Sequence, residues 1–250
     1  MKGSDILVKC LEREGVDRVF GIPGEENLDL MDSLIDSSIE FVLTRHESSA
    51  AFMAGMVGRL TQRPGACLTT LGPGASNMVI GVAEAYLGYY PLVAMSGQVR
   101  QECQRAPRKQ YIDQVSMFRP ITKASMSVTS AASVPEMTRR AFDLASEERP
   151  GPVFLELPEE VMKQRGDAVP LAVRRLETAA PDRAGLEELR GLLASSQRPI
   201  VLAGHGVVRA RASEELRRFA ERWNVPTAMT WLGAGSVPFD HALSLGTVGL

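Results

Sequence analysis

The sequence predicts an α/β fold: a doubly wound, mostly parallel sheet, followed by an incomplete second α/β domain. Two observations favour this fold class. Short apolar segments alternate with helical segments almost from the start of the chain, and Gly- and Pro-containing turns follow several of the apolar segments. Short, almost wholly apolar runs are typical of strands in a parallel sheet, because helices cover both faces of such a sheet.

The first domain is expected to begin with a helix that Ser4 and Asp5 can cap and that Gly15 can end. Its apolar positions include Ile6, Leu7 and Leu11, at helical spacing. The elements that follow are expected as strand 16–20, a helix through 28–34, strand 41–44, helix 48–60, strand 66–70, helix 75–88, strand 92–96, strand 121–128, helix 134–147 and strand 153–157.

After the last of these strands the sequence has several charges and prolines and no clean hydrophobic period, and we place the domain boundary there. We expect a first domain over 1–165, a linker over 166–183 with Pro170 and Pro181, and a second domain over 184–250. The second domain is expected to contain helix 184–194, strand 199–203, a loop at Gly204-His205-Gly206, helix 212–223 and strand 226–230. Two or three strands cannot bury both faces of a parallel sheet, so we expect this domain to be truncated or completed by another segment.

Composition excludes several function classes. The chain has 250 residues, 44% of them hydrophobic, and a formal net charge of −2, so it offers no basic footprint for nucleic acid. The most apolar window, 79–95, is interrupted by Glu84 and Pro91, which argues against a membrane span. Three widely separated cysteines form neither metal-ligand spacing nor a disulfide framework, and together with the absence of a signal-peptide pattern they favour a cytoplasmic location.

Candidate chemistry lies in the loops that follow the strands. Arg45-His46-Glu47 comes directly after strand 41–44, at the edge where open α/β sheets bind ligands. Glu47 is either an ordinary helix-start carboxylate or an acid in a pocket that shares a proton with a ligand nitrogen.

Two further loops belong to the same expected edge. Gly72-Pro73-Gly74-Ala75-Ser76-Asn77 is either a plain strand-to-helix turn or a place where missing side chains let a ligand approach the backbone. Gly21-Ile22-Pro23-Gly24 has the same two interpretations. Three such loops on one edge together predict a cleft.

Two other features carry weaker hypotheses. The cluster Arg100, Arg105, Arg108 and Lys109 is either a solvated loop or a mobile segment that handles an anionic group. Gly204-His205-Gly206 follows an apolar strand but lacks the third glycine of a dinucleotide fingerprint, so His205 is expected to be a loop residue without a chemical task.

These motifs, in this order, resemble the thiamine-diphosphate-dependent enzymes of the acetolactate synthase family, over essentially the whole chain. The matching segments are 19–24, 45–47, 71–77, 91–94, 96–99, 120–123, 149–153 and 157–158. The resemblance implies that 1–165 is the pyrimidine-binding domain and that 184–250 begins the central domain, which binds FAD in some members. A third domain, which holds the cofactor's diphosphate and Mg²⁺, has no match here, so the metal ligands are expected outside this chain.

The resemblance also implies residue roles. Glu47 is the implied catalytic residue, which hydrogen-bonds ring nitrogen N1′ of the cofactor's aminopyrimidine and so promotes loss of the thiazolium C2 proton. The implied cofactor-binding residues are Pro23, Gly24, Glu47, Thr70, Gly72, Pro73, Asn77 and Gln110.

The implied reaction is decarboxylation of a 2-oxo acid such as pyruvate, followed by ligation to a second 2-oxo acid. The segment 101–113 departs from the anabolic synthases, and Lys109 stands where the catabolic ones typically have histidine, so decarboxylases, C–C lyases and oxidases remain alternatives. A non-catalytic partner that keeps the fold is a further alternative. Since this chain would supply half an active site, it is expected to be inactive alone and to act in a homo-oligomer, dimer or tetramer, or with a diphosphate-domain partner.

Overall fold

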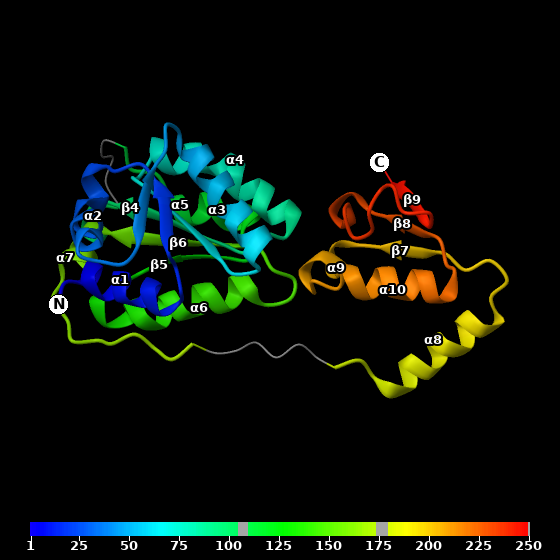
Figure 1. Cartoon of the computed structure of the whole chain (residues 1–250). Helices are drawn as coiled ribbons and strands as arrows, with labels where there is room; N and C mark the ends of the chain where they lie inside the picture. The colour runs from blue at the N-terminus through cyan, green and yellow to red at the C-terminus, as the bar shows by residue number, and fades with distance from the viewer. Residues whose placement is uncertain (105–109, 174–179, 250) are drawn as a thin grey trace. The chain divides into compact units, whose positions relative to one another are not determined.

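The computed structural model describes residues 1–104, 110–173 and 180–249 (Figure 1). The chain divides into two compact units, Met1–Leu176 and Glu177–Leu250, and each is described by itself below.

The first unit is built on a six-stranded sheet with the order β2-β1-β3-β4-β6-β5. Every neighbouring pair in this sheet is parallel. The predicted doubly wound α/β fold is therefore confirmed for this unit. The strands are β1 (Arg18–Gly21), β2 (Glu40–Leu43), β3 (Gly65–Thr69), β4 (Leu92–Gln98), β5 (Ala124–Ser127) and β6 (Pro152–Pro158).

Helices cover both faces of this sheet, because the connections between its parallel strands cross over through helices. One face carries α1 (Gly3–Arg13), α2 (Leu28–Ile35), α6 (Val134–Ser146) and α7 (Glu159–Lys163). The other face carries α3 (Glu47–Thr61), α4 (Pro73–Gly88) and α5 (Gln114–Phe118).

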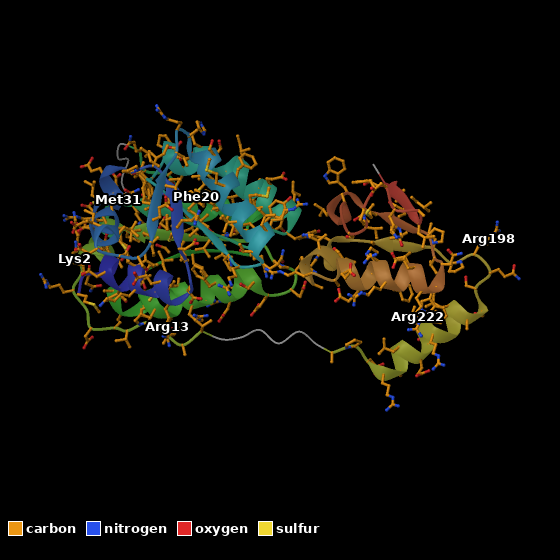
Figure 2. The ribbon with its side chains drawn as sticks, viewed as in Figure 1. Lys2, Arg13, Phe20, Met31, Arg198 and Arg222 are labelled. Carbon is orange, nitrogen blue, oxygen red and sulfur yellow. The ribbon has the colours of Figure 1, made fainter. Side chains whose placement is uncertain are left out.

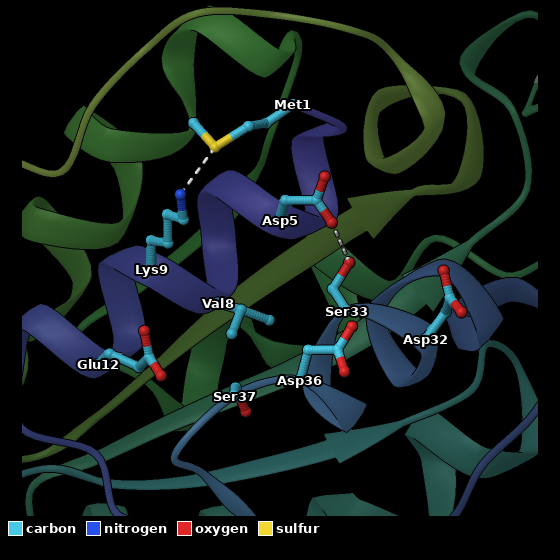
Figure 3. Close-up of a pocket in the computed structure, with 9 residues that line it drawn as sticks. All are labelled: Met1, Asp5, Val8, Lys9, Glu12, Asp32, Ser33, Asp36 and Ser37. Carbon is cyan, nitrogen blue, oxygen red and sulfur yellow. Dashed lines mark hydrogen bonds between the residues drawn. The ribbon is translucent and has the colours of Figure 1, made fainter.

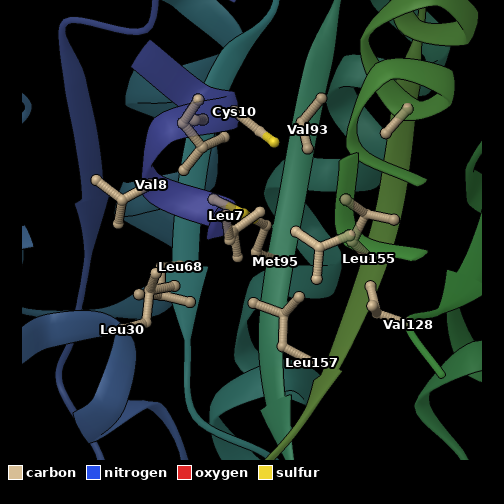
Figure 4. Packing of buried hydrophobic residues seen from close by; sticks show 14 of the residues in the cluster. Leu7, Val8, Cys10, Leu30, Leu68, Val93, Met95, Val128, Leu155 and Leu157 are labelled. Atoms are coloured by element: carbon tan, nitrogen blue, oxygen red, sulfur yellow. The ribbon is translucent and has the colours of Figure 1, made fainter. Parts of the chain in front are cut away.

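Buried side chains alternate between the two faces along each central strand. In β4, Val93 and Met95 pack under α1 and α6, while Leu92 and Ala94 pack under α3 and α4. Figure 4 shows the first set, where Leu7 of α1 lies against Met95 of β4. Phe20 of β1 belongs to the second set and lies inside the first unit (Figure 2). A continuous apolar strand is thus buried on both sides, as a parallel sheet requires.

Small residues let α3 and α4 pack closely against each other. A Cβ on Gly81 of α4 would lie 2.6 Å from the Cβ of Ala51 in α3, closer than real Cβ atoms approach. This contact fixes how the first turns of α3 sit beside the middle of α4. The candidate carboxylate Glu47 is the first residue of α3.

Two sequence predictions about element ends need correction. The first helix begins at Gly3, so Ser4 lies buried inside it and does not cap it, whereas Asp5 does cap the helix, because its carboxylate accepts a hydrogen bond from the Lys2 backbone N–H at 2.7 Å. The strand expected over 121–128 begins only at Ala124, because Pro120 sits in a 3-10 turn, η3 (Arg119–Ile121). Gly15 does follow the first helix, with a φ of 80° that only glycine adopts easily.

The second unit contains a three-stranded parallel sheet in the order β7-β8-β9. Arg222 lies exposed on α10 (Ser213–Trp223), and Arg198 lies exposed in the segment before β7 (Val201–Ala203) (Figure 2). His205 is the first residue of α9, so its expected place in a loop is wrong. The elements are α8 (Arg183–Ser195), β7 (Val201–Ala203), α9 (His205–Arg209), α10 (Ser213–Trp223), β8 (Thr227–Met229) and β9 (Ser244–Thr247).

Within the described ranges, no helix is both long and apolar enough to cross a membrane.

Candidate active site at the carboxyl edge of the sheet

Three loops meet the same edge of the first sheet. The strands β2, β1 and β3 are neighbours and run in the same direction, so the loops after Leu43, Gly21 and Thr69 leave at one edge. The strand order also reverses here, because the chain goes from β1 outward to β2 and then returns to β3. Such a switch point is where open α/β sheets bind ligands.

Local hydrogen bonds fix the loop that leads to Glu47. The buried Thr44 donates its backbone N–H to the carbonyl oxygen of Gly21 at 2.9 Å, which continues the pairing of β2 with β1 for one more residue. His46 then caps α3, since its Nδ1 accepts a hydrogen bond from the Ser48 backbone N–H at 3.2 Å. Glu47 is consequently held at the first helical position, half-buried, where the helix dipole favours a negative charge.

Glu47 and Asn77 form the polar centre of the site. The Nδ2 atom of Asn77, on α4, donates a hydrogen bond to Oε2 of Glu47 at 2.9 Å. A Cβ added to Gly74 would lie 3.5 Å from Oε1 of Glu47 and 3.0 Å from Cγ2 of Thr70. The missing side chain at Gly74 therefore leaves space beside the second carboxylate oxygen.

Thr70 joins this centre to the loop after β1. Its hydroxyl donates a hydrogen bond to Oε2 of Glu26 at 2.7 Å, and its carbonyl accepts one from the Ser96 hydroxyl at 2.8 Å. A Cβ on Gly24 would lie 2.4 Å from the Cβ of Thr70, so this loop can approach only because residue 24 is glycine.

Gly72 joins the site to the segment before α5. It has a φ of 56°, and a Cβ there would lie 2.1 Å from the carbonyl oxygen of Gln110. Gln110 itself has a φ of 68°. The backbone of Gln110 is therefore seated directly against the turn that opens α4.

The structure thus brings most of the expected site residues into three contacts: Gly24 with Thr70, Glu47 with Asn77, and Gly72 with Gln110. Pro23 lies exposed in the loop after β1, and Pro73 lies exposed as the first residue of α4. Sequence reasoning missed Glu26, a second carboxylate at this edge. Its position two residues after the Gly21–Gly24 turn was the available signal.

Only one residue of the predicted basic cluster belongs to the described residues. Arg100 is exposed after β4, whereas Arg105, Arg108 and Lys109 lie outside the described residues. The hypothesis that this cluster handles an anionic group therefore stays a prediction.

An acidic surface pocket lies away from these loops, between α1 and α2 (Figure 3). Ser33 donates a hydrogen bond to Asp5 at 2.7 Å, and Lys9 approaches the sulfur of Met1 at 3.0 Å. No group of three or more metal-ligating side chains is found within the described part of the chain. The pocket contains none of the expected site residues; it is lined by Met1, Asp5, Val8, Lys9, Glu12, Asp32, Ser33, Asp36 and Ser37.

Fold and site together define an α/β cofactor-binding domain, with a carboxylate and glycine-lined space at the switch point of a parallel sheet. Comparison with protein families agrees. Residues 1–117 match the thiamine pyrophosphate enzyme N-terminal TPP-binding domain, and residues 186–250 match the thiamine pyrophosphate enzyme central domain. The chain therefore belongs to the thiamine pyrophosphate enzymes, as the sequence motifs indicated.

Within this family the chain is similar to acetolactate synthase large subunits. It is 40% identical over 258 residues to the "Probable acetolactate synthase large subunit" of Methanocaldococcus jannaschii, covering 100% of this chain and 44% of that protein. It is 37% identical over 262 residues to the chloroplastic acetolactate synthase of Arabidopsis thaliana, covering 100% of this chain and 38% of that protein. The chain thus spans less than half the length of these relatives.

Proposed function

We propose that this chain is the N-terminal part of an acetolactate-synthase-like enzyme and that Glu47 is its catalytic carboxylate. The observation that carries the proposal is the Glu47–Asn77 hydrogen bond at the switch point, beside the space left by Gly74. The family match to a TPP-binding domain and the names of the similar proteins support it.

The residues at this edge fit an aminopyrimidine ring. The ring needs a proton-sharing partner for one nitrogen and close approach of backbone on its flat faces. Glu47 would supply the first, and Gly74 beside its Oε1 would allow the second, while Gly24 and Gly72 would hold the surrounding loops against Thr70 and Gln110. Pro23, Pro73 and Gln110 would border the ring. When bound, thiamine diphosphate supplies an electron sink for decarboxylation of 2-oxo acids.

Asn77 gives the two carboxylate oxygens of Glu47 different tasks. Because the Asn77 amide occupies Oε2, the described residues leave Oε1 without a hydrogen bond. We infer that Oε1 is the atom that holds or releases a proton toward ring nitrogen N1′, while Asn77 fixes the orientation of the carboxylate. General acid–base catalysis needs such a fixed geometry first.

An exposed apolar surface on α3 and α4 supports an oligomer. Phe52, Met53, Met56 and Leu60 are exposed on α3, and Ile80 and Leu87 are exposed on α4. On α4, Ile80 lies one turn beyond Asn77, so this surface continues from the candidate site. We propose that a second copy of the enzyme covers it, which would place a partner subunit beside Glu47; large exposed apolar patches mark such interfaces.

The expected reaction is decarboxylation of a 2-oxo acid and ligation to a second 2-oxo acid. Mg²⁺ would be bound through the cofactor's diphosphate by residues outside this chain, and FAD by the central domain in those members that carry it. A decarboxylase, C–C lyase or oxidase of the same family is the alternative reaction. A partner that has lost its chemistry is disfavoured, because His46 caps α3, and Ala51 and Gly81 make its close packing against α4, so neither feature requires a carboxylate at position 47.

An activity assay tests the proposal. The chain is mixed with thiamine diphosphate, Mg²⁺ and pyruvate, with and without a diphosphate-binding domain from a related enzyme, and acetolactate is measured. We expect acetolactate only from the mixture that contains both parts. Acetolactate from this chain alone would contradict the half-site proposal, whereas an inactive mixture in which both parts bind each other and the cofactor would contradict the proposed reaction.

A further inference from the structure

A buried amide network lies at the base of the segment that carries Gln110. Gln98 is the last residue of β4, and Gln114 is the first residue of α5; both are completely buried. Two glutamines inside a protein are costly unless their amides are hydrogen-bonded. Their contacts therefore indicate what they hold in place.

Each glutamine bonds to the backbone beside the other one. Nε2 of Gln98 donates to the carbonyl oxygen of Ile112 at 3.1 Å, two residues before Gln114. Nε2 of Gln114 donates to the carbonyl oxygen of Gly97 at 3.0 Å, one residue before Gln98. These reciprocal bonds, hereafter the amide clamp, tie segment 110–114 to the end of β4.

Glu156 orients the clamp from the neighbouring strand β6. Its Oε2 accepts the second amide hydrogen of Gln98 at 2.9 Å, and Gln98 Oε1 accepts the Val99 backbone N–H at 3.0 Å. Every hydrogen-bonding group of the Gln98 amide is thereby engaged, so its orientation is fixed. Glu156 is only 3% exposed, and burial raises the pKa of its carboxyl group.

The clamp is connected to the candidate site by direct contacts. It holds Ile112, and two residues earlier the Gln110 carbonyl is seated against Gly72. Gly72 opens α4, which carries both Gly74 and Asn77 next to Glu47. A change in the clamp would thus move Gln110 and the turn that opens α4 without touching Glu47 itself.

We propose that Gln98 and Gln114, oriented by Glu156, are positioning residues that hold segment 110–112 against Gly72 and thereby set the affinity for the 2-oxo acid. This inference rests on the proposed function for its substrate. The existence of the clamp does not depend on that function.

Two variants and one control test the proposal. Gln98→Met removes the bonds to Ile112 and Glu156. Gln114→Met is the milder change, because Oε1 of Gln114 has no partner within the described residues and only the bond to Gly97 is lost. Gln101→Met is the control, because Gln101 lies exposed in the same region.

Amide hydrogen exchange in the 250-residue chain provides the readout that needs no activity. We expect exchange across 110–114 to accelerate at least about tenfold in both clamp variants, with unchanged exchange in β3 and in the Gln101→Met control. Unchanged exchange in both clamp variants would overturn the proposal.

Steady-state kinetics of the chain combined with a diphosphate-binding domain provide the second readout. We expect KM for pyruvate to rise about tenfold, the equivalent of one lost hydrogen bond, with kcat within about twofold. A fall in kcat at unchanged KM would overturn the substrate role. Inactivity of the wild-type mixture would instead overturn the proposed function, and the exchange measurement would still decide whether the clamp exists.

Discussion

The backbone conformation of Gly72 lets Gln110 pack directly against the candidate site. Gly72 needs a positive φ, and the Gln110 carbonyl occupies the place where a Cβ would be. We expect Gly72→Ala to lower the free energy of unfolding by about 2–4 kcal/mol, because strain and the steric clash add. Urea unfolding of the chain measures this change.

Gly55→Ala is the matched control for that substitution. Gly55 lies inside α3, and a Cβ there would meet its neighbours at 3.7 Å, an ordinary contact distance. We expect this change to leave the unfolding free energy unchanged or to raise it by up to about 1 kcal/mol. Equal effects of both substitutions would contradict the close approach at Gly72.

At the residue level, a candidate could be named from the sequence where a residue type followed a clear element, and its role stays a prediction. Glu47 was predicted as a candidate because it comes directly after an apolar strand. Glu26 was missed because a Gly-Ile-Pro-Gly turn does not reveal which later side chain will reach Thr70. The amide clamp was missed as well, since Gln98 and Gln114 are ordinary polar residues until the fold buries them.

At the level of elements, a buried ion pair joins the end of α1 to α6. Glu14 pairs with Arg139, and both side chains are almost fully buried. Burial raises the pKa of Glu14 to about 7, because desolvation of the carboxylate outweighs the attraction of Arg139.

The raised pKa of Glu14 predicts a pH-dependent stability. The folded protein binds this proton more tightly than the unfolded chain, so the contribution is complete below about pH 4.5 and is lost as pH rises to about 7. The loss corresponds to roughly 3 kcal/mol. We expect Glu14→Gln to remove this part of the slope in urea unfolding from pH 4.5 to 8, whereas Glu40→Gln, at an exposed position, keeps it. Identical slopes for wild type and Glu14→Gln would contradict this assignment.

Element prediction followed the strength of the periodic signal. The long helices and buried strands were predicted because their apolar spacing extends over several turns or a whole strand. The short helices α5, α7 and α9 and the strand β9 were missed, because segments of four or five residues carry too little periodicity. Strand β5 was predicted too long, because the predicted range begins at Ile121, which belongs to the 3-10 turn with Pro120.

At the level of the whole molecule, the apolar surface of α3 and α4 predicts an oligomer. We expect Met56→Glu, in the centre of the exposed stripe on α3, to shift the assembled enzyme toward monomers, because a charge would be buried at the interface. Sedimentation velocity measures the change, and circular dichroism checks that the fold is kept.

Ile35→Glu is the control, because Ile35 is 77% exposed on α2, on the opposite face of the sheet. It is expected to leave the oligomer intact. An unchanged oligomer in Met56→Glu, or an equal loss in both variants, would contradict the assignment of this surface as the interface.

The central claim is that the Glu47 carboxylate exchanges a proton with the cofactor's pyrimidine ring. The most direct measurement is the rate of hydrogen–deuterium exchange at thiazolium C2 of enzyme-bound thiamine diphosphate, followed by NMR after rapid quenching. We expect Glu47→Gln to slow this exchange by about 10²–10⁴-fold with the fold and cofactor binding retained, and Glu40→Gln to leave it unchanged. Exchange at the wild-type rate in Glu47→Gln would contradict the account.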